Sequence, residues 1–97
     1  MPTRKILPSF WEDYGRLTDA KQQRFLRVLQ RFIEDVERGE FRASLRIKPL
    51  VDNPGIWEMT WEGNDGRATF NYGPEQVPGK RHIVWRRIGG HEIFQAP

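Results

Sequence analysis

Residues 56 to 72, IWEMTWEGNDGRATFNY, decide the fold of this chain. Apolar and polar side chains alternate in residues 57–62 and again in residues 67–72, which is the period of a β-strand with one buried face. Gly63-Asn64-Asp65-Gly66 between them is a strong turn signal, so the segment predicts a β-hairpin. The side chains expected to face the core are those of Trp57, Met59, Trp61, Ala68, Phe70 and Tyr72.

A long amphipathic helix is predicted before the hairpin. Apolar residues recur at helical spacing in residues 25–36, Thr18 is placed to cap the first turn, and Gly39 is placed to end the last one. The segment Ser9-Phe10-Trp11-Glu12 has the pattern of a capping box, which predicts a shorter helix ending near Leu17. The first part of the chain is therefore expected to form a helical hairpin.

Further strands are expected on either side of the central hairpin. Residues 45–48 alternate, a loop is predicted over residues 73–80, and a last strand follows it. Residues 5–7 are a candidate for a short edge strand, because Pro8 lacks the amide proton that a central strand needs. These elements predict an α+β fold in which the helical hairpin packs on one face of a small, mainly antiparallel sheet of three to four strands. The other face is expected to be open.

Length and composition exclude several classes of protein. The 97 residues suffice for one core, so residues 1–97 are expected to form a single domain. The chain has no cysteine, which excludes disulfides and thiolate metal sites and fits a reducing cytoplasm. No long apolar run is present, so we expect neither a leader peptide nor a membrane partner. The net charge of +3 permits binding of nucleic acid.

The open face of the predicted sheet collects side chains suited to RNA cleavage. Cleavage without a metal needs a base for the 2′-hydroxyl, cations for the phosphorane and an acid for the leaving oxygen. Glu58 is the central carboxylate, Arg67 can hold a phosphate, and His91 can exchange a proton near neutral pH. Glu58 can equally pair with a cross-strand arginine, and His91 can equally bond the backbone. Candidate RNA-binding residues are Arg46, Lys48, Arg86 and Arg87.

The order of four segments resembles the RelE/ParE toxin superfamily. After the helical hairpin come Leu45-Arg46-Ile47-Lys48-Pro49-Leu50, Pro54-Gly55-Ile56-Trp57-Glu58, Gly66-Arg67-Ala68-Thr69-Phe70 and Trp85-Arg86-Arg87-Ile88-Gly89-Gly90-His91-Glu92-Ile93-Phe94. The resemblance spans nearly the whole chain. It implies a RelE-like fold and the toxin of a bacterial toxin–antitoxin pair, with a cognate antitoxin protein as partner.

In RelE-like members, the resemblance further implies ribosome-dependent cleavage of mRNA with no metal or cofactor. Arg67 matches the arginine that contacts the scissile phosphate, and His91 occupies the late acid/base position. Phe94 stands near the position at which many RelE-like enzymes have a terminal catalytic tyrosine, and Glu58 stands where RelE has a lysine. The alternatives are a ParE-like inhibitor of DNA gyrase without nuclease activity and a non-toxic binding module. Arg67 together with His91 favours the endoribonuclease.

Overall fold

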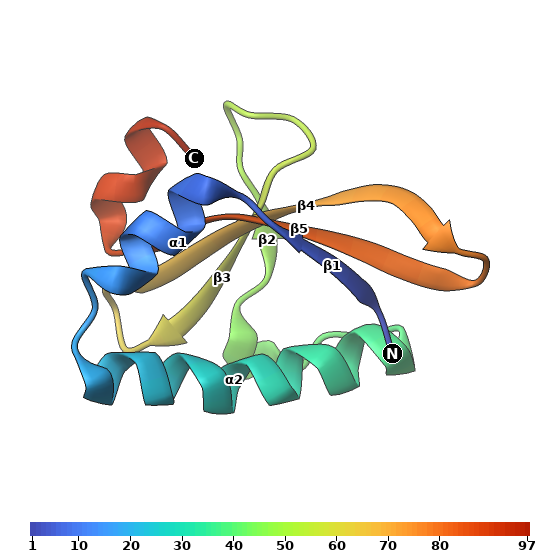
Figure 1. Cartoon of the computed structure of the whole chain (residues 1–97), viewed down its shortest axis with the longest axis horizontal. Helices are drawn as coiled ribbons and strands as arrows, with labels where there is room; N and C mark the ends of the chain where they lie inside the picture. The colour runs from blue at the N-terminus through green and yellow to red at the C-terminus, as the bar shows by residue number, and fades with distance from the viewer.

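The computed structural model describes all 97 residues as two helices and a five-stranded sheet (Figure 1). The elements are β1 (Thr3–Ile6), α1 (Pro8–Gly15), α2 (Asp19–Arg38), the 3-10 turn η1 (Ala43–Leu45), β2 (Lys48–Pro49), β3 (Trp57–Glu62), β4 (Gly66–Val77), β5 (Lys80–Gly89) and the 3-10 turn η2 (His91–Gln95). The strand order is β1-β5-β4-β3-β2, with β1 parallel to β5 and all other neighbours antiparallel. The predicted α+β architecture is confirmed, with five strands rather than three or four.

The central hairpin forms as predicted, from β3 and β4. Met59 is paired with Ala68 and Trp57 with Phe70, so the alternating apolar side chains of β3 and β4 share one face. Met59, Ala68 and Phe70 are fully buried. Neither helix of the protein combines the length and the apolar composition needed to span a lipid bilayer.

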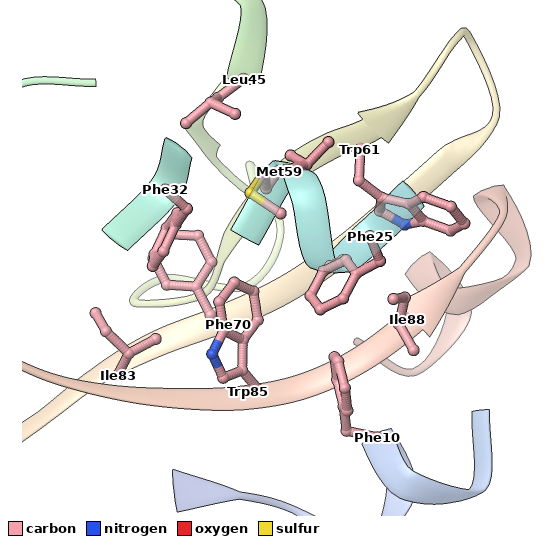
Figure 2. Packing of buried hydrophobic residues seen from close by; sticks show 12 residues of the cluster. Phe10, Phe25, Phe32, Leu45, Met59, Trp61, Phe70, Ile83, Trp85 and Ile88 are labelled. Carbon is pink, nitrogen blue, oxygen red and sulfur yellow. The ribbon is translucent and has the colours of Figure 1, made fainter. Parts of the chain in front are cut away.

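The core lies between this face and the two helices. Figure 1 shows α2 running along one side of the sheet, and Figure 2 shows its Phe32 packed against Phe70 and Trp85. The ring centroid of Phe32 is 5.1 Å from that of Phe70 and 4.9 Å from that of Trp85. Aromatic pairs at such distances add to the free energy gained by burying their area. The predicted stripe of α2 therefore forms the centre of the core.

The ends of the helices confirm one predicted cap and correct another. The Thr18 side chain accepts a hydrogen bond from the Lys21 amide, and Gly39 ends α2 with φ of 84°. The predicted capping box at Ser9 is wrong, because Leu7 is the N-cap and Pro8 already lies in the first turn. The Ser9 hydroxyl instead donates to the Arg86 carbonyl at 2.7 Å.

Two predicted segments differ in the structure. Residues 45–48 do not form a strand: η1 ends at Leu45, Arg46 adopts a left-handed conformation, and only Lys48–Pro49 pairs with β3. The predicted loop over residues 73–80 is mostly strand, since β4 continues to Val77 and turns tightly into β5. Pairing of Gly73 with His82 and of Val77 with Lys80 holds this extension despite Pro74.

The outer edge of β5 is covered by two successive elements. β1 pairs with residues 82–85, which confirms the predicted edge strand near residues 5–7. Beyond β1, the start of α1 and its Asp13 bond to the backbone of β5. The Leu7 amide donates to the Trp85 carbonyl, and the Asp13 carboxylate accepts from the Ile88 amide at 3.1 Å. Such coverage protects an edge from pairing with another chain.

The sheet face opposite α2, here called the polar face, is less open than predicted. η2 lies on this side in Figure 1, and its Ile93 is buried. Arg86 and Arg87 donate to the carbonyls of Pro97 and Ala96, which ties the end of the chain down. Buried polar side chains on this face are those of Glu58, Thr60, Arg67 and Thr69.

Candidate functional site

Glu58 and Arg67 lie together on the polar face. The Arg67 Nε atom is 3.9 Å from the Glu58 carboxylate, and both side chains are about one-tenth exposed. Lys48, which is paired with Glu58 across β2 and β3, places its Nζ 3.7 Å from the same oxygen. The structure therefore brings three of the predicted site residues into one cluster, with a carboxylate between two cations.

Arg67 keeps most of its hydrogen-bonding capacity. Its one hydrogen bond runs from Nη1 to the Gly66 carbonyl at 3.1 Å, and its distance to Glu58 is that of a loose ion pair. A guanidinium has five N–H donors. The cluster can therefore offer several donors to an anion beside the Glu58 carboxylate.

Thr69 of β4 and Arg86 of β5 extend the site. Thr69 is paired with Glu58, is fully buried, and has no hydrogen-bond partner for its hydroxyl. Arg86 donates from Nη1 to the Asn71 side chain at 3.1 Å and from Nε to the Pro97 carbonyl at 3.2 Å. Arg86 thus lies beside Asn71, two positions along β4 from Thr69, and its contact with RNA stays a prediction.

Arg87 is held by a different element. Its Nε and Nη2 donate to the two carboxylate oxygens of Asp13 at 2.6 and 3.1 Å, and this hydrogen bonding raises the pKa of the Arg87 guanidinium. A register shift of the β4–β5 ladder between Thr69 and Phe70 adds one residue to β5, so that Arg87 is paired with Thr69 and does not point into the core as strict alternation from Trp85 would require. Arg87 therefore joins α1 to the sheet, and its contact with RNA stays a prediction.

His91 lies at the edge of the site. Its Nδ1 is 3.3 Å from the Asp65 carboxylate, its ring meets Phe94 edge-on at 5.8 Å, and its side chain is 61% exposed. It forms no hydrogen bond with Glu58 or Arg67, but Arg67 is paired with Gly89, two residues before it. Asp65 was not predicted as a site residue, because an aspartate in a Gly-Asn-Asp-Gly turn is explained by the turn alone.

Comparison with known proteins finds a relative by structure but none by sequence. No family model matches the chain, and no curated protein sequence does. Among solved structures, a YoeB/ParE toxin from Agrobacterium tumefaciens matches 92% of this chain and 98% of its own, with a TM-score of 0.65 and 20% identity. The chain has the fold of this YoeB/ParE toxin.

On this YoeB/ParE fold, Arg46 lies apart from the Glu58 cluster. The sequence predicts it beside Lys48 on one strand, whereas the structure places it in a groove of about 380 Å³ with Arg24 and Arg31 of α2. The reason is the left-handed turn at Arg46, which ends η1 and redirects the chain before β2 begins. Of the predicted cations, Lys48 and Arg67 therefore lie at Glu58, whereas Arg46 lies in a separate groove.

The helix side of the same fold has an apolar groove, in contrast to the groove that contains Arg46. A groove of about 400 Å³ runs between β1, α1 and α2 and is lined mainly by apolar side chains. Trp11 and Leu26 at this groove are 56% and 42% exposed, whereas the aromatic rings beneath them belong to the core.

Proposed function

We propose that this chain is the toxin of a bacterial toxin–antitoxin pair and that it cleaves mRNA on the ribosome. The fold that it shares with a YoeB/ParE toxin supports the toxin role. The cluster of Glu58, Arg67 and Lys48 carries the nuclease part, because a carboxylate and two cations within 4 Å supply a base and phosphate ligands together. Its partners are then the ribosome, mRNA and a cognate antitoxin, and it acts in the cytoplasm.

The proposed reaction uses the RNA's own 2′-hydroxyl as nucleophile. Glu58 takes the 2′ proton, the 2′-oxygen bonds to the adjacent phosphorus, and the bond from phosphorus to the 5′-oxygen breaks. Arg67 and Lys48 hold the non-bridging oxygens and stabilise the charge that develops on them. The products are a 2′,3′-cyclic phosphate and a 5′-hydroxyl. The dependence on a 2′-hydroxyl makes the reaction specific for RNA.

His91 is proposed to protonate the leaving 5′-oxygen. A carboxylate at one imidazole nitrogen orients the ring and leaves the other nitrogen for the substrate, and Asp65 stands at the Nδ1 of His91. Phe94 cannot transfer a proton, and its edge-on contact restricts the imidazole ring instead. Substrate binding can close the remaining distance, since catalytic hydrogen bonds often tighten only in the bound complex.

The remaining predicted RNA ligands divide into two roles. Arg86 is proposed to bind a phosphate next to the cleaved one, because it crosses the polar face beside Asn71. Arg87 is proposed to act indirectly by fixing α1 and the end of the chain, since Asp13 and the Ala96 carbonyl already occupy its donors.

The test is cleavage of a defined mRNA on purified ribosomes, with the new 5′ ends mapped. Glu58→Gln keeps the shape of the side chain and removes the base, so we expect the rate to fall by about 10²- to 10⁴-fold. Arg27→Ala is the matched control, because Arg27 is exposed on α2 and has no ion-pair partner. Thermal unfolding of each variant excludes a loss of fold.

Two results would contradict the proposal. Cleavage by Glu58→Gln at the wild-type rate would remove Glu58 from the reaction. Intact mRNA in cells that express the protein, together with linear DNA covalently bound to gyrase, would instead assign the chain to gyrase inhibitors. A small neighbouring open reading frame with a DNA-binding motif is the expected source of the antitoxin, and its co-expression should restore growth.

A further inference from the structure

A second polar groove lies along the outer edge of β3, between α2 and η1. Arg24 and Arg31 of α2 line one wall, and Ser44 and Arg46 line the other. We propose that this arginine groove binds the phosphodiester backbone of single-stranded RNA. The choice of RNA as ligand rests on the proposed function, whereas the affinity for a phosphodiester chain rests on the groove itself.

The groove contains positive charge that the protein does not neutralise. Glu62 is its one carboxylate, and it is already paired with Lys21 at 3.4 Å and with Arg24 at 3.2 Å. Arg31 and Arg46 form no ion pair and no side-chain hydrogen bond. Arg87 and Arg42, by contrast, are each bound to a buried carboxylate, that of Asp13 and that of Asp35. Unpaired guanidinium groups in a shared hollow are suited to an external anion.

The backbone at Arg46 supports a functional role. Its φ of 49° and ψ of 45° make it the only non-glycine residue with positive φ, and every other such position is glycine. A residue with a side chain is disfavoured in this conformation, which is associated with functional sites when it persists. A long cation therefore occupies a position where glycine or asparagine would be less strained.

The groove is continuous with the Glu58 cluster through one residue. Thr60 lines the groove, and it is paired with Arg67 across β3 and β4. β2 pairs with β3 only at Trp57 and Glu58, so the groove borders the rest of the outer edge of β3. An RNA strand held by Arg67 at the cleaved bond can therefore continue over this edge between Arg31 and Arg46.

The lining favours phosphate over an acidic peptide. The apolar residues of the groove, Val28, Leu45 and Trp61, are each at least nine-tenths buried in the core. They offer no exposed pocket for the apolar anchors that dominate most peptide interfaces. Binding of a phosphodiester chain requires only cations and becomes weaker as salt rises. A nucleic-acid backbone is thus the ligand that this groove fits.

The test measures binding of a fluorescein-labelled 2′-O-methyl oligouridylate by anisotropy over a range of salt concentrations. The probe cannot be cleaved, because its 2′-oxygen is methylated. The variant Arg31→Gln/Arg46→Asn removes two charges, and asparagine tolerates the left-handed backbone. The control Arg27→Gln/Lys80→Gln removes two exposed charges outside the groove.

We expect the groove variant to bind more weakly and its slope of log affinity against log salt to fall by about 1.4, the value for two lost phosphate contacts on a single strand. The control should keep nearly the wild-type slope. An equal loss in both variants would overturn the proposal and assign binding to net charge. An unchanged slope in the groove variant would also overturn it, as would stronger binding of oligoglutamate than of the oligouridylate.

Failure of this proposal can be distinguished from failure of the proposed function. If the groove variant loses binding of the probe while the wild type leaves ribosome-bound mRNA intact, the arginine groove stands and the nuclease proposal fails. If the wild type cleaves mRNA but the groove variant binds the probe as the wild type does, the groove proposal fails alone.

Discussion

The two faces of the sheet are both largely hidden from water, but they differ in what burial does for the protein. On the helix side, rings such as Phe32, Phe70 and Trp85 pack together, and burial of their area stabilises the fold. On the polar face, Glu58, Arg67 and Thr69 are no more than 9% exposed, and burial of such groups is unfavourable unless they are fully bonded. One face therefore provides stability, and the other keeps its polar groups at the expense of stability.

The largest effect is expected where the helix face is most tightly packed. Phe32→Ala removes a ring that is 1% exposed and lies against Phe70 and Trp85, so we expect a loss of about 3–5 kcal/mol in the free energy of unfolding. Urea unfolding at neutral pH measures it. Leu26→Ala on the exposed side of the same helix is the control and should change stability far less. Equal losses in both variants would contradict the inference that burial of Phe32 against the sheet is what stabilises the helix side.

The helix face is also the part of the molecule that sequence predicts best. The stripe at residues 25–36 and the alternation at residues 57–72 are local patterns, and each is imposed by one buried side of one element. The Thr18 cap and the Gly39 stop are equally local. These features are correct in the structure because a neighbouring element of any identity would bury the same side.

The polar face was predictable only in part, because its arrangement depends on distant contacts. The alternation placed Glu58 and Arg67 correctly on one face. The pairing of Arg87 with Thr69 depends on a register shift, and the hydrogen bonding of Arg87 depends on Asp13, 74 positions away. The cover supplied by η2 gives no periodic signal in the sequence. Arg46 was misplaced because alternation over four residues also fits a turn.

The second prediction concerns the bridge between the two faces. Asp13→Asn removes the carboxylate that binds Arg87 and the Ile88 amide, and it leaves a partly buried guanidinium without its partner. Since hydrogen bonds to charged groups are each worth about 1.5–3 kcal/mol, we expect a loss in that range. A double-mutant cycle with Arg87→Ala in urea unfolding tests the coupling. Additive losses, combined with weaker RNA binding by Arg87→Ala, would instead support a direct role of Arg87 in RNA binding.

The third prediction concerns Asp35, a buried carboxylate on the helix side. Unlike the polar groups of the polar face, it is fully hydrogen-bonded. Asp35 accepts hydrogen bonds from the Arg42 side chain and amide and from Arg38. The side-chain hydrogen bond from Arg42 is the main cause that lowers the pKa of Asp35 from 3.8 to about 2. Because the folded state has the lower pKa, the stabilisation is present above the unfolded pKa and is lost as the pH falls toward about 2.

The measurement for Asp35 is the urea midpoint as a function of pH. Asp35→Asn should be less stable than the wild type by a constant amount above about pH 5, and the gap should close between about pH 4 and pH 2. Glu40→Gln is the control, because Glu40 is an exposed acid near the same end of α2. A gap that stays constant down to pH 2 would show that the charge of Asp35 is not what stabilises this end of the helix.

The smallest expected effect has the opposite sign and lies on the polar face. The Thr69 hydroxyl is fully buried without a hydrogen-bond partner, so Thr69→Val removes an unsatisfied group, keeps the β-branched shape and should raise the free energy of unfolding by about 1 kcal/mol. Thermal unfolding measures this change. Thr60→Val is the control and should change stability little, because Thr69 alone has a fully buried hydroxyl without a partner. If Thr69→Val is more stable but cleaves mRNA more slowly, the hydroxyl is kept for the substrate at a cost to stability. If it is less stable than the wild type, Thr69 has a partner in solution, and the polar face is better satisfied than its geometry indicates.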